Sequence, residues 1–269
     1  MLCTLPLAVA GCHPAQSAQA GRLVITGSST VAPLVAEIGK RFEADSGVRV
    51  DVQTGGSSRG LADARQGLAN IGMASRALKP GEEDLAGFAI AHDGICLIVH
   101  ASNPIAELSK EQVVDAFTGK IADWAALGSD PLGSELGPIS VVNKAEGRST
   151  LELFLAHFDL DNRDIRASVV IGDNEQGIKT VAGNPGAIGY VSIGAAEHAR
   201  DRGVPIKLLP LAGVEANTAN LANGRFPLAR PLTLVTHGEP DDLARRFIDF
   251  ARSQQVHDLV RELSFVPVG

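Results

Sequence analysis

The chain has 269 residues, a formal net charge of −7 at pH 7 and 45% hydrophobic residues. This length is enough to bury a substantial core, as one large domain or as two smaller ones. The acidic balance argues against nucleic acid or an anionic membrane face as a partner. It does not argue against a small anion, which responds to nearby dipoles and charges.

The first twelve residues have the pattern of an export signal. Residues 7–10 are apolar, and small residues precede Cys12, as at the cleavage site of a bacterial lipoprotein signal peptide. We therefore expect residues 1–11 to be a signal peptide, Cys12 to be lipidated and residues 12–22 to form a tether. A chance apolar leader is the alternative, because no Lys or Arg precedes the apolar stretch.

Cysteine usage agrees with export. If Cys3 leaves with the signal and Cys12 is acylated, Cys96 is the only thiol of the mature chain and no intramolecular disulfide can form. Cys96 lies in an apolar run, so we expect it to be buried and inert. No cysteines and histidines have metal-ligand spacing, so neither a metal nor another cofactor is expected.

Apolar strand-like runs alternate with helical patterns, which is typical of an α/β protein. A helix is expected over residues 241–252, because Leu243, Phe247 and Ala251 fall on one face. The expected strands are residues 23–26, 48–54, 71–74, 89–100, 139–143, 168–171, 187–192, 207–211 and 231–236.

Three short runs rich in Gly, Ser and Thr lead directly into amphipathic helices: residues 27–30, 55–58 and 147–150. Apolar residues follow each run at helical spacing. A helix N-terminus presents unpaired N–H groups and the positive end of the helix dipole, and hydroxyls add donors without bulk. Three such ends together predict a site for a small oxyanion, although each alone is also typical of an ordinary helix cap.

One motif supports a competing interpretation. Residues 56–60, Gly-Ser-Ser-Arg-Gly, fit the nucleophile elbow of a serine hydrolase, with Ser58 as nucleophile and with Asp241 and His257 later in the chain. That elbow normally follows several strands, whereas only one strand precedes the strand that leads into it here. We therefore favour a binding site without catalytic residues and keep the hydrolase as the remote alternative.

The chain resembles the substrate-binding proteins of bacterial phosphate-specific ABC transporters, from Leu23 to its C-terminus. Seven stretches carry the resemblance, and their order and spacing make it specific. They are residues 27–34 (GSSTVAPL), 55–60 (GGSSRG), 69–78 (ANIGMASRAL), 117–124 (FTGKIADW), 143–154 (NKAEGRSTLELF), 183–194 (GNPGAIGYVSIG) and 265–269 (FVPVG).

The resemblance implies a two-lobed periplasmic-binding-protein fold of type II, with crossings between the lobes near residues 99–103 and 229–234. Lobe I would hold residues 23–100 and 233–269, and lobe II residues 101–232. The lobes would close around a ligand on a hinge of two strands. The protein would be an exported, monomeric lipoprotein of the periplasm or cell surface. It would capture inorganic phosphate and deliver it to the permease of an ABC importer.

The resemblance also carries the family's phosphate contacts onto this sequence. A desolvated oxyanion needs oriented donors, and the implied contacts are hydroxyls, backbone N–H groups and cations. They are Ser29, Thr30, Val31, Ser57, Ser58, Ser75 and Arg76 from lobe I, and Lys144, Arg148, Ser149 and Thr150 from lobe II.

Departures from the family's pattern leave the ligand open. Arg76 stands where some members carry an Asp that accepts the proton of hydrogen phosphate and so excludes sulfate. Arg148 and Arg59 replace small residues, and Ser149 replaces a Gly. The added arginines either neutralise a dianion, admit a bulkier phosphorylated ligand or point to solvent. Phosphonate, arsenate, sulfate or molybdate, and a sensor role in place of transport, are the alternatives. Asn174 also lies near the implied site but is not placed among its contacts.

Overall fold

The computed structural model describes residues 21–127 and 136–269, so the predicted signal peptide and Cys12 lie outside the described residues. The described strands are β1 (Arg22–Gly27), β2 (Arg49–Thr54), β3 (Ile71–Ala74), β4 (Leu85–His100), β5 (Ser140–Lys144), β6 (Val169–Ile171), β7 (Ala187–Ser192), β8 (Ile206–Leu208), β9 (Ala229–His237) and β10 (Val266–Pro267). The described α-helices are α1 (Ala32–Ser46), α2 (Ser57–Arg65), α3 (Lys110–Phe117), α5 (Ser149–Phe158), α6 (Asn174–Ala182), α7 (Ile193–Asp201), α8 (Thr218–Ala222), α9 (Asp242–Ala251) and α10 (His257–Glu262). The predicted α/β class is confirmed.

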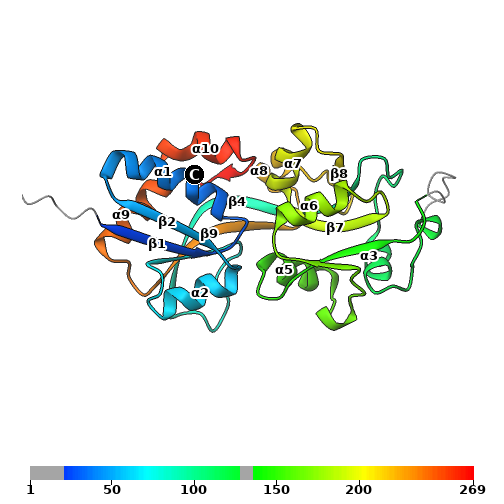
Figure 1. Cartoon of the computed structure of the whole chain (residues 1–269), viewed down its shortest axis with the longest axis horizontal. Coiled ribbons are helices and arrows are strands. Elements are labelled where there is room, and N and C mark those ends of the chain that lie inside the picture. Colours follow the sequence, from blue (N-terminus) through cyan, green and yellow to red (C-terminus); the bar gives the residue numbers. More distant parts are fainter. Residues whose placement is uncertain (1–20, 128–135) are drawn as a thin grey trace, which may run out of the picture.

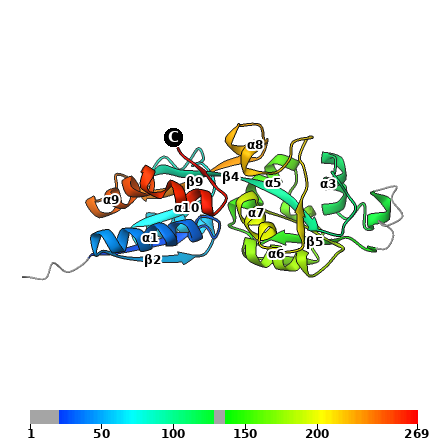
Figure 2. The same ribbon diagram turned by 90° about the horizontal axis from the view of Figure 1, so that it is seen from above.

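The fold consists of two lobes joined by the strands β4 and β9 (Figures 1 and 2). In lobe I, β1 pairs in parallel with β2 and β3, and β3 pairs antiparallel with β9. In lobe II, β5 pairs in parallel with β6 and β7, and β7 pairs antiparallel with β4. The helices α1 and α10 lie on one face of the lobe I sheet and α2 on the other (Figure 1). None of the helices in the described residues is long and apolar enough to cross a membrane.

The strand pairing shows where the chain passes between the lobes. β4 pairs with β9 as far as Gly94 and with β7 from Ile95 onward. The return lies at the start of β9, because Leu228 still packs in the lobe II core. The first crossing therefore comes several residues before the expected region 99–103. β4 carries side chains of both cores, and its polar run His92-Asp93-Gly94 lies where the strand passes from lobe I to lobe II.

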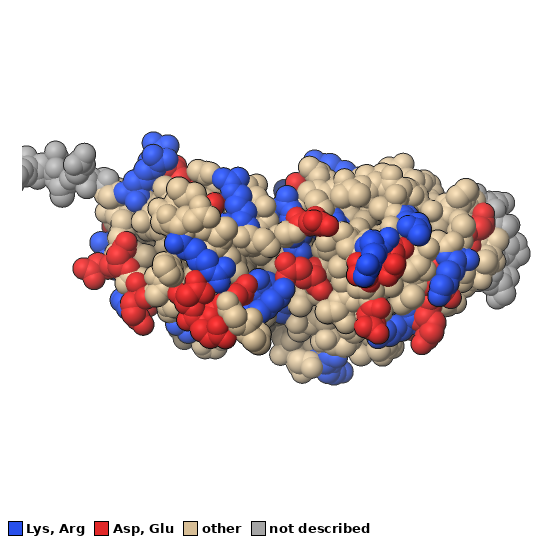
Figure 3. All heavy atoms as spheres, turned by 90° about the horizontal axis from the view of Figure 1, so that it is seen from below, with Lys and Arg blue, Asp and Glu red and all other residues tan. Residues whose placement is uncertain are grey.

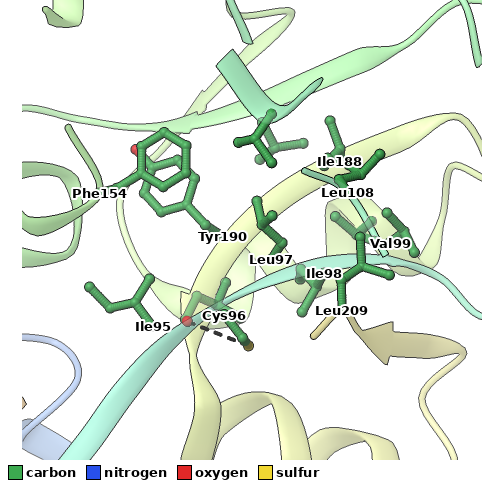
Figure 4. Packing of buried hydrophobic residues seen from close by; sticks show 14 of the residues in the cluster. Ile95, Cys96, Leu97, Ile98, Val99, Leu108, Phe154, Ile188, Tyr190 and Leu209 are labelled. Carbon is green, nitrogen blue, oxygen red and sulfur yellow. Dashed lines mark hydrogen bonds between the residues drawn. The ribbon is translucent and has the colours of Figure 1, made fainter. Parts of the chain in front are cut away.

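Each lobe has its own apolar core. In lobe II the ring of Tyr190 stacks on Phe154, with ring centroids 3.9 Å apart and planes at 6° (Figure 4). Cys96 lies in the same core, 2% exposed, and its thiol faces the carbonyl of Val191 (Figure 4). Burial raises the pKa of this thiol well above its ordinary value, which keeps it protonated. The prediction of a buried cysteine is confirmed, and the raised pKa agrees with the expected low reactivity.

Candidate functional site

A small pocket lies between the lobes. Its lining is almost wholly composed of hydroxyl-bearing, amide, glycine and basic residues: Ser28, Ser29, Thr30, Gly56, Ser57 and Ser75 from lobe I, and Lys144, Arg148, Ser149, Thr150, Gly172 and Asn174 from lobe II.

Three helices begin at the pocket, as the sequence predicted. The N-cap residues of α1, α2 and α5 are Val31, Gly56 and Arg148, and none of the three caps its helix with a side-chain hydrogen bond. Side chains cap the N-termini of α3, α6, α7, α8 and α9, whereas the short helix α10, away from the pocket, also lacks such a cap. The first N–H groups of α1, α2 and α5 therefore have no side-chain partner, and the positive ends of three dipoles meet at one place.

Hydroxyl groups of the pocket accept hydrogen bonds from protein groups around them. Thr30 Oγ1 accepts from Asn174 Nδ2 at 3.2 Å, and Ser57 Oγ accepts from the backbone N–H of Ser75 at 3.3 Å. Both nitrogens only donate, so the hydroxyl hydrogens are free to point elsewhere. Ser149 Oγ is buried without a hydrogen-bond partner. The hydroxyls are thus arranged to donate to an acceptor within the pocket.

Two cations line the pocket and none of its described lining residues is a carboxylate. Lys144 is 3% exposed, and its Nζ donates to Asn174 Oδ1 at 3.0 Å. Burial, with a smaller contribution from the nearby Arg230, lowers the pKa of Lys144 to about 7. Arg148 Nε is buried without a hydrogen-bond partner. The charge of the pocket is positive and unbalanced, which favours an anion.

Arg76 does not line the pocket, which corrects its expected role as an anion contact. Its Nη1 and Nη2 donate to the two carboxylate oxygens of Glu82, each at 2.8 Å. Its Nε lies 3.2 Å from Glu152 Oε2 in lobe II. Two carboxylates attract the guanidinium away from the pocket, and only the preceding residue, Ser75, lines it. Glu82, which also accepts from the Lys79 N–H, has its pKa lowered to about 2 by Arg76.

The Ser58 side chain also does not line the pocket. The Val31 side chain is fully buried in the core of lobe I, so the contact expected of Val31, its backbone N–H at the start of α1, stays a prediction. Ser58 is exposed on the first turn of α2, and its backbone N–H donates to the Gly147 carbonyl of lobe II at 3.2 Å. His257 lies on α10 with its Nε2 buried and without a partner. Ser58 lies on α2 and His257 on α10, on opposite faces of the lobe I sheet (Figure 1), so the nucleophile-elbow interpretation is wrong. Arg59 pairs with Asp63 at the surface.

Sequence reasoning did not assign several residues that the structure brings to the site, among them Gly172, Asn174 and Arg230. Asn174 bridges the lobes, because it accepts from Lys144 and donates to Thr30. The run Asp173-Asn174 opens α6, so it carries the same helix-start signal as the three predicted runs. Arg230 lies behind the lining residues of the pocket. The sequence feature that could have identified it is a charged residue next to the apolar run of β9.

The two lobes are in contact around the pocket. Glu152 of lobe II accepts from Lys79 of lobe I at 2.5 Å. Gly56 has φ +93°, and a Cβ at this position would lie 2.7 Å from the carbonyl oxygen of Gly147 in the other lobe. Basic and acidic side chains gather over the junction of the lobes (Figure 3). The pocket is therefore bounded by both lobes, which contact each other beside it.

Comparison with known proteins places the chain in a family. The model of the PBP superfamily domain matches residues 13–255. The phosphate-binding protein PstS of Bacillus subtilis is 27% identical over 254 residues, which cover 92% of this chain and 81% of that protein. A Clostridium perfringens structure described as a phosphate ABC transporter substrate-binding protein with bound phosphate is 30% identical, with a TM-score of 0.83, and the match covers 93% of this chain and 100% of that chain. An ABC-type phosphate transport receptor from Vibrio cholerae is 25% identical, with a TM-score of 0.74, over 91% of this chain and 100% of that chain. Matched over nearly its whole length, the chain belongs to the PBP superfamily and, within it, to the family of phosphate ABC transporter substrate-binding proteins.

Proposed function

We propose that this chain captures inorganic phosphate between its two lobes and delivers it to the permease of an ABC importer. The observation that carries the proposal is the composition of the pocket wall. Three helix N-termini without side-chain caps, hydroxyls that face the pocket as donors, and two cations meet in one small pocket. Each oxygen of a tetrahedral oxyanion needs such donors when it leaves water.

The relatives support phosphate as the ligand. The Bacillus subtilis protein is named for phosphate binding, and the Clostridium perfringens structure contains bound phosphate. The contacts around the pocket come from both lobes, so an anion would stabilise the closed arrangement, and its release would accompany opening on β4 and β9. A transporter's binding protein must bind its ligand and release it chemically unchanged, and this arrangement allows both steps.

The proposal includes an extracytoplasmic location, a monomer and a lipid anchor on Cys12. It is supported by the apolar stretch before Cys12 and by the small residues that precede it. Expression of the full chain in a bacterial host tests the anchor: Cys12→Ala should remove the acyl mass and move the protein to the soluble fraction. The matched variant Cys96→Ala should retain the lipid. A lipidated Cys12→Ala protein would exclude this anchor.

The ligand is tested by calorimetric titration of the mature chain, freed of bound anion, with phosphate and then with sulfate at the same ionic strength. We expect one phosphate per chain. Thr150→Val should weaken binding by about 1.5–3 kcal/mol, because a charge-assisted hydrogen bond is lost. Thr118→Val is the matched control, since the Thr118 hydroxyl donates to the Val114 carbonyl on α3. Binding of sulfate, arsenate, phosphonate or molybdate in place of phosphate would overturn the assignment.

A further inference from the structure

Behind the pocket, a buried ion pair joins the two strands that connect the lobes. Asp93 of β4 and Arg230 of β9 are directly opposed in the antiparallel ladder. Arg230 donates to Asp93 Oδ2 from Nη2 at 2.9 Å and from Nε at 3.2 Å. The two side chains are 0% and 1% exposed, and neither residue lines the pocket. The pair therefore lies at the hinge, outside the lining of the pocket.

The remaining nitrogen of Arg230 reaches the pocket wall. Nη1 donates to Thr150 Oγ1 at 2.8 Å and to Ser75 Oγ at 3.3 Å. Thr150 belongs to lobe II and Ser75 to lobe I, and both line the pocket. One guanidinium nitrogen, with its two N–H groups, therefore contacts a hydroxyl from each lobe.

The direction of these hydrogen bonds determines what the two hydroxyls can do. A guanidinium donates and never accepts, so each hydroxyl uses an oxygen lone pair toward Arg230 and turns its own hydrogen away. The nearby positive charge also polarises each O–H bond and strengthens it as a donor. Both hydroxyls are thereby prepared to donate to an oxygen in the pocket before any ligand arrives.

Asp93 allows the guanidinium of Arg230 to stay charged in the protein interior. An unpaired guanidinium in the interior would carry a large desolvation penalty, which an opposed carboxylate offsets. Asp93 Oδ1 also accepts from the Gly194 N–H at the start of α7, at 3.2 Å, so the carboxylate is fixed at both oxygens. The position of Arg230 is consequently set by both lobes.

We propose that Arg230 is a positioning residue that commits Ser75 and Thr150 to donate, so that the pocket receives unprotonated oxygens of an oxyanion at these two points. The proposal rests on the proposed function and deepens it, because it names the residue that selects the form of the anion. Arg230 acts through the two hydroxyls and has no contact with the ligand.

A double-mutant cycle on phosphate affinity tests this role in the full chain. Thr150→Val is measured alone and in a background that carries Arg230→Met with Asp93→Asn, which avoids an unpaired buried carboxylate. In the native background we expect Thr150→Val to weaken phosphate binding by about tenfold or more. In the background without Arg230, the factor by which Thr150→Val weakens binding should be smaller by about fivefold or more. Thr118→Val should show no such coupling with Arg230.

A purely structural role for the ion pair predicts a different result. Arg230→Met with Asp93→Asn would then lower affinity and melting temperature, but its effect would be additive with that of Thr150→Val. Additivity would overturn the proposal. If the neutral pair does not fold, Arg230→Lys takes its place: a single ammonium cannot reproduce the guanidinium fork, so the coupling should shrink but not vanish. An Arg230→Lys protein with the full native coupling would also overturn the proposal.

The failure of this inference is distinguishable from failure of the proposed function. A native chain that binds no phosphate would overturn the function, and the same cycle measured with sulfate would then decide the role of Arg230. A native chain that binds phosphate with additive variants would leave the function in place and remove Arg230 from its specificity.

Discussion

The ammonium group of Lys144 donates to Asn174 Oδ1 at 3.0 Å, and the amide nitrogen of the same Asn174 donates to Thr30 in the opposite lobe at 3.2 Å. A buried charge of lobe II is thus connected through one amide to a hydroxyl of lobe I. No carboxylate among the described lining residues balances this charge. An anion between the lobes supplies the balance, which links anion binding to closure.

The stability of the anion-free chain should depend on Lys144 above neutral pH. Burial lowers the pKa of Lys144 to about 7 in the folded chain, whereas the unfolded side chain titrates near its ordinary value. Above about pH 7 the unfolded chain therefore binds a proton at Lys144 that the folded chain lacks. The contribution of Lys144 to the free energy of unfolding should then rise with pH above about pH 7 and stay constant below it. Between about pH 7 and about pH 9 the gain should be about 2 kcal/mol in denaturant unfolding. Lys144→Met should remove the gain, and Lys179→Met, on the exposed side of α6, should retain it.

Phosphate affinity should depend on pH in the opposite direction from the stability of the anion-free chain. An anion beside Lys144 raises the pKa of its ammonium group, so binding takes up a proton above neutral pH. Phosphate affinity should then fall from about pH 8 to about pH 9, where the ligand stays a dianion, by up to about tenfold. Calorimetry in two buffers of different ionisation enthalpy would detect the proton. An equal slope in Lys144→Met would contradict the assignment.

Arg148 should contribute to anion affinity directly. It lines the pocket, and its Nε is buried without a hydrogen-bond partner. Arg148→Ser should weaken phosphate binding by about 1.5–3 kcal/mol, because a charged donor is lost. Arg59→Ser is the control, since Arg59 pairs with Asp63 on the exposed surface of α2. Equal affinities of the two variants would mean that Arg148 only faces solvent.

Gly56 should be required for closure of the lobes. Its φ of +93° disfavours a side chain, and a Cβ would collide with the Gly147 carbonyl at 2.7 Å. Gly47 also has a positive φ, +71°, but a Cβ added there would meet nothing within 4 Å. Both Gly→Ala variants should lose about 1 kcal/mol of stability from backbone strain. Only Gly56→Ala should also lose phosphate affinity, by about tenfold or more in a titration. Similar affinities would mean that the lobes do not meet here on binding.

Glu152 should act as a weak latch between the lobes. It lies 3.2 Å from Arg76 Nε and accepts from Lys79, and both partners belong to lobe I. Lys79 is half exposed, so the expected loss on Glu152→Gln is about 0.5–1 kcal/mol of binding free energy. The loss should shrink as salt is added, because exposed pairs are screened. Glu175→Gln breaks an exposed pair within lobe II and should change nothing. A salt-independent loss would argue for another role of Glu152.

Much of the local structure is predictable from neighbouring residues. Strand β7 spans the predicted residues 187–192, and α1, α2 and α5 begin at the three predicted runs. A strand or a helix start depends on the pattern of a few consecutive side chains, which is fully present in the sequence. The short strand β10 was missed because its two residues, one of them Pro267, carry no periodic signal.

The sequence by itself determined the α/β elements, the three helix starts and, through the order of its motifs, the family. Only the tertiary structure decided the partners of the arginines. Arg76 turns to Glu82 and Glu152 and leaves the pocket, whereas Arg230 meets Asp93, 137 positions away, and supports the pocket from behind. A guanidinium forms hydrogen bonds with the carboxylates and hydroxyls that the folded lobes place next to it. Those contacts exist only after β4 and β9 have paired, so no local pattern records them.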